Sequence, residues 1–180
     1  MTPAPRPGSS LSYQEARAQV MSNETAARVA SVNISPGGVP KLPVDEAWVG
    51  VRGLAGDGHN EPEPSHGGPD KAVSLYSVES IARVAAEGHT AFPGAFGENL
   101  TLEGVEMGEL EVGTRLQIGD RGLLIEMVEH AQPCQTLGHW FEGRHIARIS
   151  GKTHPDDARW YARVISEGPV RPGDVVERVS

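Results

Sequence analysis

The single cysteine of the chain, Cys134, is the first residue whose chemistry stands out. It lies in the stretch AQPCQTLGHW, directly after Pro133 and shortly after an apolar run. Proline disfavours a helical conformation for the preceding Gln132, so we expect the thiol at the start of a loop or turn. The neighbourhood is polar and includes His130 and His139, which a cysteine filling a gap in the core would not need. Such a thiol can act as a nucleophile or as a ligand for a soft metal.

Cys134 also has less reactive interpretations. A lone cysteine is most often a small buried hydrophobic residue, and an incidental surface thiol costs a cytoplasmic protein little. A cysteine–histidine hydrolase, with Cys134 as nucleophile and His59 or His66 as base, is conceivable, although neither order nor spacing supports it. The residue by itself therefore leaves nucleophile, metal ligand and packing open.

Three glycine-containing loops carry the other candidate residues. Each loop adjoins an expected strand end, where loops tend to gather functional residues. Taken singly, they have ordinary explanations, since an aspartate between two glycines commonly just forms a turn. The candidates are Asp57 and His59 in RGLAGDGHN, His66, Gly67, Gly68 and Lys71 in SHGGPDK, and Glu98 and Asn99 in PGAFGENL.

Common catalytic and nucleotide-binding motifs are absent from this sequence. It contains no Walker loop, no GxGxxG after a strand, no HExxH and no CxxC. One thiol with scattered histidines also argues against a structural zinc site.

Short strands are the elements expected to position these loops. The chain has 22 glycines and 14 prolines in 180 residues and few aromatic residues, which indicates many turns and a mainly β fold. Strand patterns cover residues 26–35, 46–51, 72–77, 109–130, 160–166 and 175–179.

Residues 77–88 carry the clearest helical pattern. Ile81 and Val84 share one face, Ser77 is a suitable cap and Gly88 a suitable stop. Residues 1–25 are expected to form a disordered tail with a possible short helix, because prolines dominate the first ten residues. The length suits one further unit, so we expect a single domain over residues 26–180.

The overall charge excludes some classes of partner. The formal net charge is −8, which argues against a nucleic-acid binder because phosphates need a basic face. The sequence shows no signal peptide and no apolar run long enough to cross a membrane. We therefore expect a cytoplasmic protein with a reduced thiol.

Taken together and in order, these loops resemble the MOSC domain, the module named for the C-terminal part of molybdenum-cofactor sulfurases. The resemblance extends from about Arg28 to the C-terminus and is closest to the stand-alone bacterial members. It implies a β-barrel with a few peripheral helices. The matching blocks are GVRGLAGDGHN, HGGPDKAVSLYS, PGAFGENLTLEG, VGTRLQIGD, PC and RWYARVISEGPVRPGD.

The resemblance also implies a site for the molybdenum cofactor, a pterin dithiolene with a phosphate. Cys134 would be the metal ligand or would carry sulfur as a persulfide, and a thiolate suits molybdenum because it is a soft anionic donor. Asp57 and His59 would act in catalysis through hydrogen bonds, and Lys71 would contact the phosphate. The remaining implied cofactor contacts are Arg52, His66, Gly67, Gly68, Glu98, Asn99 and Arg144.

Stand-alone members are linked to reduction of N-hydroxylated compounds. This implies an oxidoreductase with a small-molecule substrate and an external electron-donor protein, since the chain shows no flavin or iron–sulfur motif. The alternatives are a sulfur carrier, a cofactor-binding module without turnover, and a barrel with a vestigial site and a buried Cys134. A homodimer is compatible with each of them.

Two segments depart from the family pattern. The insert Asn60–Ser65 would narrow the mouth of a pocket, and the segment after Cys134 is expected to be helical around Trp140–Ile149. His130 and His139 lie outside the matched blocks, so we expect them to take no part in the site.

Overall fold

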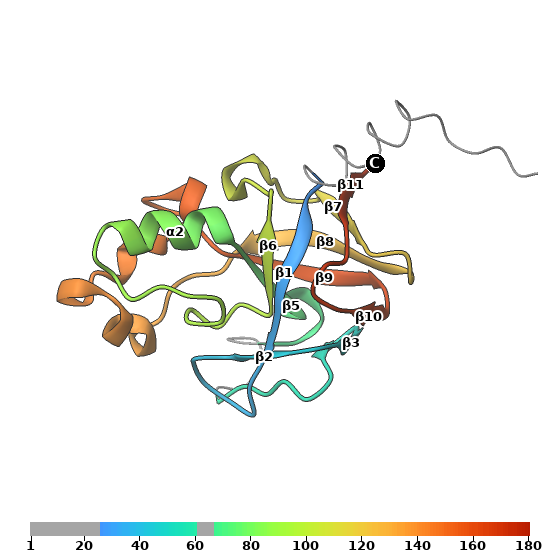
Figure 1. Ribbon diagram of the computed structural model, residues 1–180, viewed down its shortest axis with the longest axis horizontal. Coiled ribbons are helices and arrows are strands. Elements are labelled where there is room, and N and C mark those ends of the chain that lie inside the picture. Colours follow the sequence, from blue (N-terminus) through green and yellow to red (C-terminus); the bar gives the residue numbers. More distant parts are fainter. Residues whose placement is uncertain (1–25, 61–66) are drawn as a thin grey trace, which may run out of the picture.

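The computed structural model describes residues 26–60 and 67–180. The predicted tail at residues 1–25, the candidate His66 and nearly all of the Asn60–Ser65 insert lie outside the described residues. Figure 1 shows two sheets at the centre of the chain, with the helix α2 and the orange turns that follow Cys134 on one side.

The described strands form one large and one small sheet. The large sheet has the order β11-β7-β8-β9-β5-β6-β1-β2, and the small sheet has the order β10-β3-β4. Neighbouring strands are antiparallel except for the parallel pair β5–β6. The strands are β1 Arg28–Ile34, β2 Leu42–Val44, β3 Ala47–Gly50, β4 Gly53–Leu54, β5 Val73–Ser77, β6 Leu100–Glu103, β7 Arg115–Ile118, β8 Leu123–His130, β9 Trp160–Ser166, β10 Gly168–Val170 and β11 Val176–Val179.

The prediction of a mainly β fold is confirmed, but the predicted β-barrel is not closed in the described part of the chain. β2 occupies the free edge of β1 from Val32 to Ile34. Only the beginning of β1 pairs with the residues just before β11, through a single bridge between Arg28 and Val175. The backbone N–H of Val29 reinforces this contact by donating to Asp174 O at 2.9 Å. The large sheet is therefore curved round but open.

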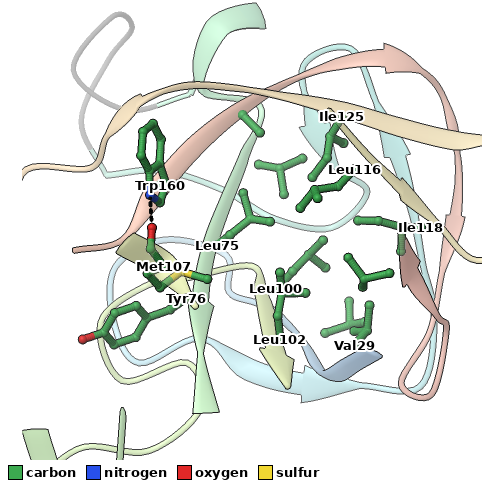
Figure 2. Packing of buried hydrophobic residues seen from close by; sticks show 14 of the residues in the cluster. Val29, Leu75, Tyr76, Leu100, Leu102, Met107, Leu116, Ile118, Ile125 and Trp160 are labelled. Carbon is green, nitrogen blue, oxygen red and sulfur yellow. Dashed lines mark hydrogen bonds between the residues drawn. The ribbon is translucent and has the colours of Figure 1, made fainter. Parts of the chain in front are cut away.

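One hydrophobic core lies between the sheets. β8 alternates buried and less buried residues, as expected for a strand with one face on the core. β5 is buried along its whole length because both of its faces are covered. Figure 2 shows Leu75, Leu100 and Ile125 packed together, with the Trp160 indole donating to Met107 O at 3.1 Å.

The predicted helix is present as α2, Val78–Ala86. The Ser77 hydroxyl accepts a hydrogen bond from Ser80 N at 3.1 Å, which caps the first turn. Ile81 and Val84 are buried on the face that the sequence pattern predicted. α2 follows β5 directly and packs against β5 and β6.

The segment after Cys134 is helical, but it forms short 3-10 turns and not the continuous helix expected over Trp140–Ile149. Gly143 and Arg144 interrupt it because both have left-handed backbones, with φ of 62° and 59°. The turns are η3 Gln135–Trp140, η4 Glu142–Arg144, η5 Ile146–Ile149 and η6 Pro155–Asp157.

Two hydrogen bonds hold this segment against the residues that follow α2. Thr90 N donates to Trp140 O at 2.9 Å, and Glu142 N donates to Nδ1 of His89 at 3.1 Å. The Phe141 ring also stacks on the core residue Phe96 with centroids 5.1 Å apart. These contacts position the η3 turn that begins immediately after the cysteine.

Candidate functional site

A cavity of about 370 Å³ lies where η3 meets the loops beside β1, β5 and β9. Five groups of residues contribute its chemistry-bearing side chains. They are Lys41 after β1, His59 and Asn60 after β4, Lys71, Ser74 and Asn99 around β5 and β6, Cys134, Thr136 and His139 at η3, and Arg159 and Tyr161 at β9.

Cys134 lies in the wall of this cavity at the residue preceding η3. Its backbone is extended, and its carbonyl accepts a hydrogen bond from Leu137 N at 3.0 Å, which begins the turn. The side chain is half-buried, and Sγ lies 2.6 Å from the Thr136 hydroxyl. The thiol is thus placed by a turn, held by a polar neighbour and open to the cavity.

Two cations line the cavity with neighbours that partly compensate them. Lys71 Nζ lies 3.2 Å from Glu129 Oε1 and 5.4 Å from the centroid of the Tyr161 ring. Lys41 is buried and paired with the Asp57 carboxylate. Burial lowers the pKa of Lys41, while the nearby charge of Asp57 opposes that change.

Asp57 itself does not line the cavity. Its Oδ1 accepts from Ser35 N at 2.9 Å, and its Oδ2 accepts from Lys41 and from Asn99 Nδ2 at 2.9 Å. The carboxylate therefore joins the turns after β1 and β4 to the turn before β6. Its catalytic role, predicted from the sequence, stays a prediction.

Glu98 and Asn99 are neighbours in sequence with different surroundings. Asn99 lines the cavity and its Oδ1 accepts from the Ser74 hydroxyl at 3.0 Å. Glu98 is fully buried behind the lining, where Oε1 accepts from Gly94 N at 2.6 Å. Burial raises the pKa of Glu98, which favours its neutral form.

The glycine pair after the insert explains how His59 reaches the cavity. Gly67 has φ of 74°, and a Cβ built on it would lie 3.1 Å from the His59 ring. A larger residue at this position would therefore be strained and would crowd the imidazole. Gly67 and Gly68 are buried next to the cavity lining and not part of it.

Arg52 and Arg144 are both exposed, and neither contributes to the cavity wall. The guanidinium of Arg144 instead lies against Gly138. Their predicted cofactor contacts have no geometric support in the described part of the chain.

His139 does line the cavity, against the expectation that it takes no part. A 3-10 helix has about three residues per turn, so Thr136 and His139 lie on the same face of η3. His130 does not line the cavity: it packs on Trp160 with centroids 4.2 Å apart, and burial lowers its pKa.

Arg159 was not predicted and lines the cavity from the position directly before β9. It is 5% exposed, and Nη1 donates to Phe96 O. In the sequence it stands at the beginning of the RWYARV block, and that block was interpreted only as a strand.

The charges of the cavity contrast with those of the chain. Three cations line it, namely Lys41, Lys71 and Arg159, and no described carboxylate does, although the chain as a whole has a charge of −8. The described residues hold no cluster of three or more His, Cys, Asp or Glu side chains placed to bind a metal ion. The arrangement suits an anionic small molecule that meets a thiol.

The fold and this site define a MOSC protein. The MOSC domain family matches residues 62–177, so the chain belongs to that family. Protein YiiM of Escherichia coli strain K12 is 33% identical over 153 residues, which cover 81% of this chain and 66% of the relative.

Two further comparisons concern a solved structure and a fungal relative. The crystal structure of YiiM from Escherichia coli superimposes with a TM-score of 0.63 at 27% identity, covering 86% of this chain and 69% of that one. A protein from Gibberella moniliformis named "Reductase" is 28% identical over 128 residues, which are 69% of this chain and 22% of the relative. The match thus covers just under two thirds of the length of the curated YiiM relative.

None of the described helices has the length and apolar character needed to cross a membrane.

Proposed function

We propose that this protein binds the molybdenum cofactor in the cavity and uses it to reduce N-hydroxylated small molecules. The observation that carries the proposal is the position of Cys134, the chain's one thiol, in the wall of a cavity lined by three cations. MOSC domains are associated with this cofactor, and the reductase name of the fungal relative supports redox chemistry.

The side chains present fit such a group. Cys134 offers one soft thiolate ligand, and a dithiolene brings two further sulfur donors of its own. The phosphate and the dithiolene are negatively charged, which matches the cationic lining. Cys134 would hold the metal, while Lys41, Lys71 and Asn99 would hold the polar parts of the pterin and phosphate.

When bound, the cofactor supplies two-electron redox chemistry. Reduction of an N–OH group consumes two electrons and two protons and gives an N–H group and water. His59 and His139 line the same cavity and are the titratable side chains placed to deliver those protons. The electrons would come from an external redox protein, and we place the reaction in the cytoplasm.

A second candidate function is sulfur transfer by Cys134. The half-buried, cavity-facing thiol, with the Thr136 hydroxyl 2.6 Å from Sγ, favours it because a persulfide needs space and a polar neighbour. A sulfane-sulfur donor, such as a low-molecular-weight persulfide, would then transfer one sulfur atom to the Cys134 thiolate and leave as its thiol, so the intact mass of the wild type should rise by one sulfur atom and that of Cys134→Ser should not. Neither candidate function depends on a homodimer.

Metal analysis of protein purified from a cofactor-producing host tests the main proposal. We expect near-stoichiometric molybdenum in the wild type, loss of molybdenum in Cys134→Ser, and retention in the exposed neighbour variant Gln135→Ala. With a chemical electron donor, N-hydroxy reduction should follow the same order. Molybdenum-free wild-type protein from that host would rule the proposal out.

A further inference from the structure

Within the part of the chain that the structure describes, Arg159 is a buried cation without an ion-pair partner. It is 5% exposed and forms no ion pair with a described carboxylate. Nη1 donates to the Phe96 carbonyl, whereas Nε has no hydrogen-bond partner in the described part of the chain. Burying a charge without a partner is costly, so this arrangement needs a reason.

The residues around Arg159 do not neutralise it. The Asp57 carboxylate is already paired with Lys41. Glu98 is the other buried carboxyl close enough to interact with Arg159, and burial raises its pKa towards the neutral form. Lys41 and Arg159 line the same cavity, and burial, with a smaller contribution from the charge of Arg159, lowers the pKa of Lys41.

Gly97 lies beside this guanidinium in the cavity wall. Its φ is 82°, and a Cβ built there would lie 3.0 Å from Val39 Cγ1 and 3.8 Å from Arg159 Nη1. A side chain at this position would therefore be strained and would crowd the wall next to the guanidinium.

We propose that Arg159, assisted by Lys41, forms an oxyanion subsite in the cavity wall that accepts a phosphate monoester or a group of similar charge and shape. A guanidinium suits this class because its planar fork donates two parallel hydrogen bonds to an oxyanion. The subsite has two possible ligands. One is the phosphate of the cofactor, and this assignment rests on the proposed function. The other is an anionic substrate.

Phosphate titration of protein made in a host without the cofactor tests the subsite directly. Inorganic phosphate and pyrophosphate should bind the wild type, measured by calorimetry and by a rise in unfolding temperature at low ionic strength. Arg159→Gln should weaken binding at least about tenfold. Arg163→Gln is the matched control, since Arg163 lies on β9, the strand that begins directly after Arg159, but is 44% exposed, and it should change affinity less than about twofold.

The unfolding temperature without phosphate separates binding from a merely structural role. Arg159→Gln removes an unpaired buried charge, so its ligand-free unfolding temperature should be unchanged or higher. Arg159→Lys is the second variant; it keeps the charge, loses the fork and should bind phosphate more weakly than the wild type. Wild-type protein that does not bind phosphate, or Arg159→Gln that binds it equally well, would overturn the subsite.

The cofactor-loaded protein identifies the source of the anion. Loss of phosphate binding on loading assigns the subsite to the cofactor's phosphate, whereas retained binding assigns it to a substrate. Molybdenum content in Cys134→Ser is a separate measurement, so failure of the subsite and failure of the cofactor proposal give different results.

Discussion

At the scale of single residues, Lys41 and Asp57 form a buried ion pair beside the cavity. Both side chains are less than 10% exposed, so removing one partner leaves the other as a buried, uncompensated charge. Such a loss is far larger than the loss of a surface pair. The charge of Asp57 should therefore contribute much more to the free energy of unfolding than the charge of Asp70, which lies in an exposed pair.

Asp57→Asn should lower the free energy of unfolding by about 3 kcal/mol, because Lys41 remains buried without its partner. Urea denaturation at neutral pH measures it. Asp70→Asn is the control: Asp70 is 69% exposed in its pair with Arg163, so the loss should stay within about 0.5 kcal/mol. Equal losses in the two variants would contradict the structural role of Asp57.

The same residue scale shows how far the sequence could predict the site. Cys134, His59, Lys71 and Asn99 were predicted and do line one cavity, because their loops all adjoin strand ends. Arg159 could not be found in this way, since a basic residue at the start of a strand gives no sign of which face it occupies.

At the scale of elements, Asp157 connects the helix α2 to the turns after the cysteine. It accepts from Arg83 Nε of α2 and from Arg148 Nη1 of η5, both at 2.8 Å. Burial alone would raise the pKa of Asp157, but these hydrogen bonds outweigh it and lower the pKa. A carboxylate with a depressed pKa in the folded state stabilises the protein above its unfolded pKa and loses that contribution as the pH falls through the folded value.

Asp157→Asn should therefore lower the free energy of unfolding by about 2 kcal/mol at neutral pH. The difference from the wild type should shrink as the pH falls below about 4, because the wild-type carboxylate is then protonated as well. Denaturation across a pH series measures both effects. The exposed neighbour variant Asp156→Asn should show neither, and a difference that is constant with pH would contradict the charge-based explanation.

The sequence predicted the positions of strands and helices better than it predicted where a helical segment is interrupted. The strand and helix patterns identified β1, β5, β9 and α2, since a two-residue or 3.6-residue period is visible locally. The breaks after Cys134 were not, because the left-handed backbone occurs at Arg144 as well as at Gly143, and an arginine gives no local sign of that conformation.

At the scale of the whole molecule, the two sheets contribute to one hydrophobic core. Val49 of the small sheet is fully buried in the same cluster as Leu75 and Ile125 of the large sheet. Sheets that share a core are expected to unfold together, as small single domains usually do. The prediction of one domain over residues 26–180 can therefore be tested through a single residue of the small sheet.

Val49→Ala should lower the free energy of unfolding by about 2 kcal/mol and shift the whole transition, with its denaturant dependence unchanged. Tryptophan fluorescence and far-UV circular dichroism should give coincident curves, because Trp48 lies on the small sheet and Trp160 on the large one. Val51→Ala makes the same substitution at a side chain that is 51% exposed, so its effect should stay within about 0.5 kcal/mol. Two separate transitions, of which only one moves in Val49→Ala, would show that the small sheet is an independent unit and that the single-domain prediction is wrong.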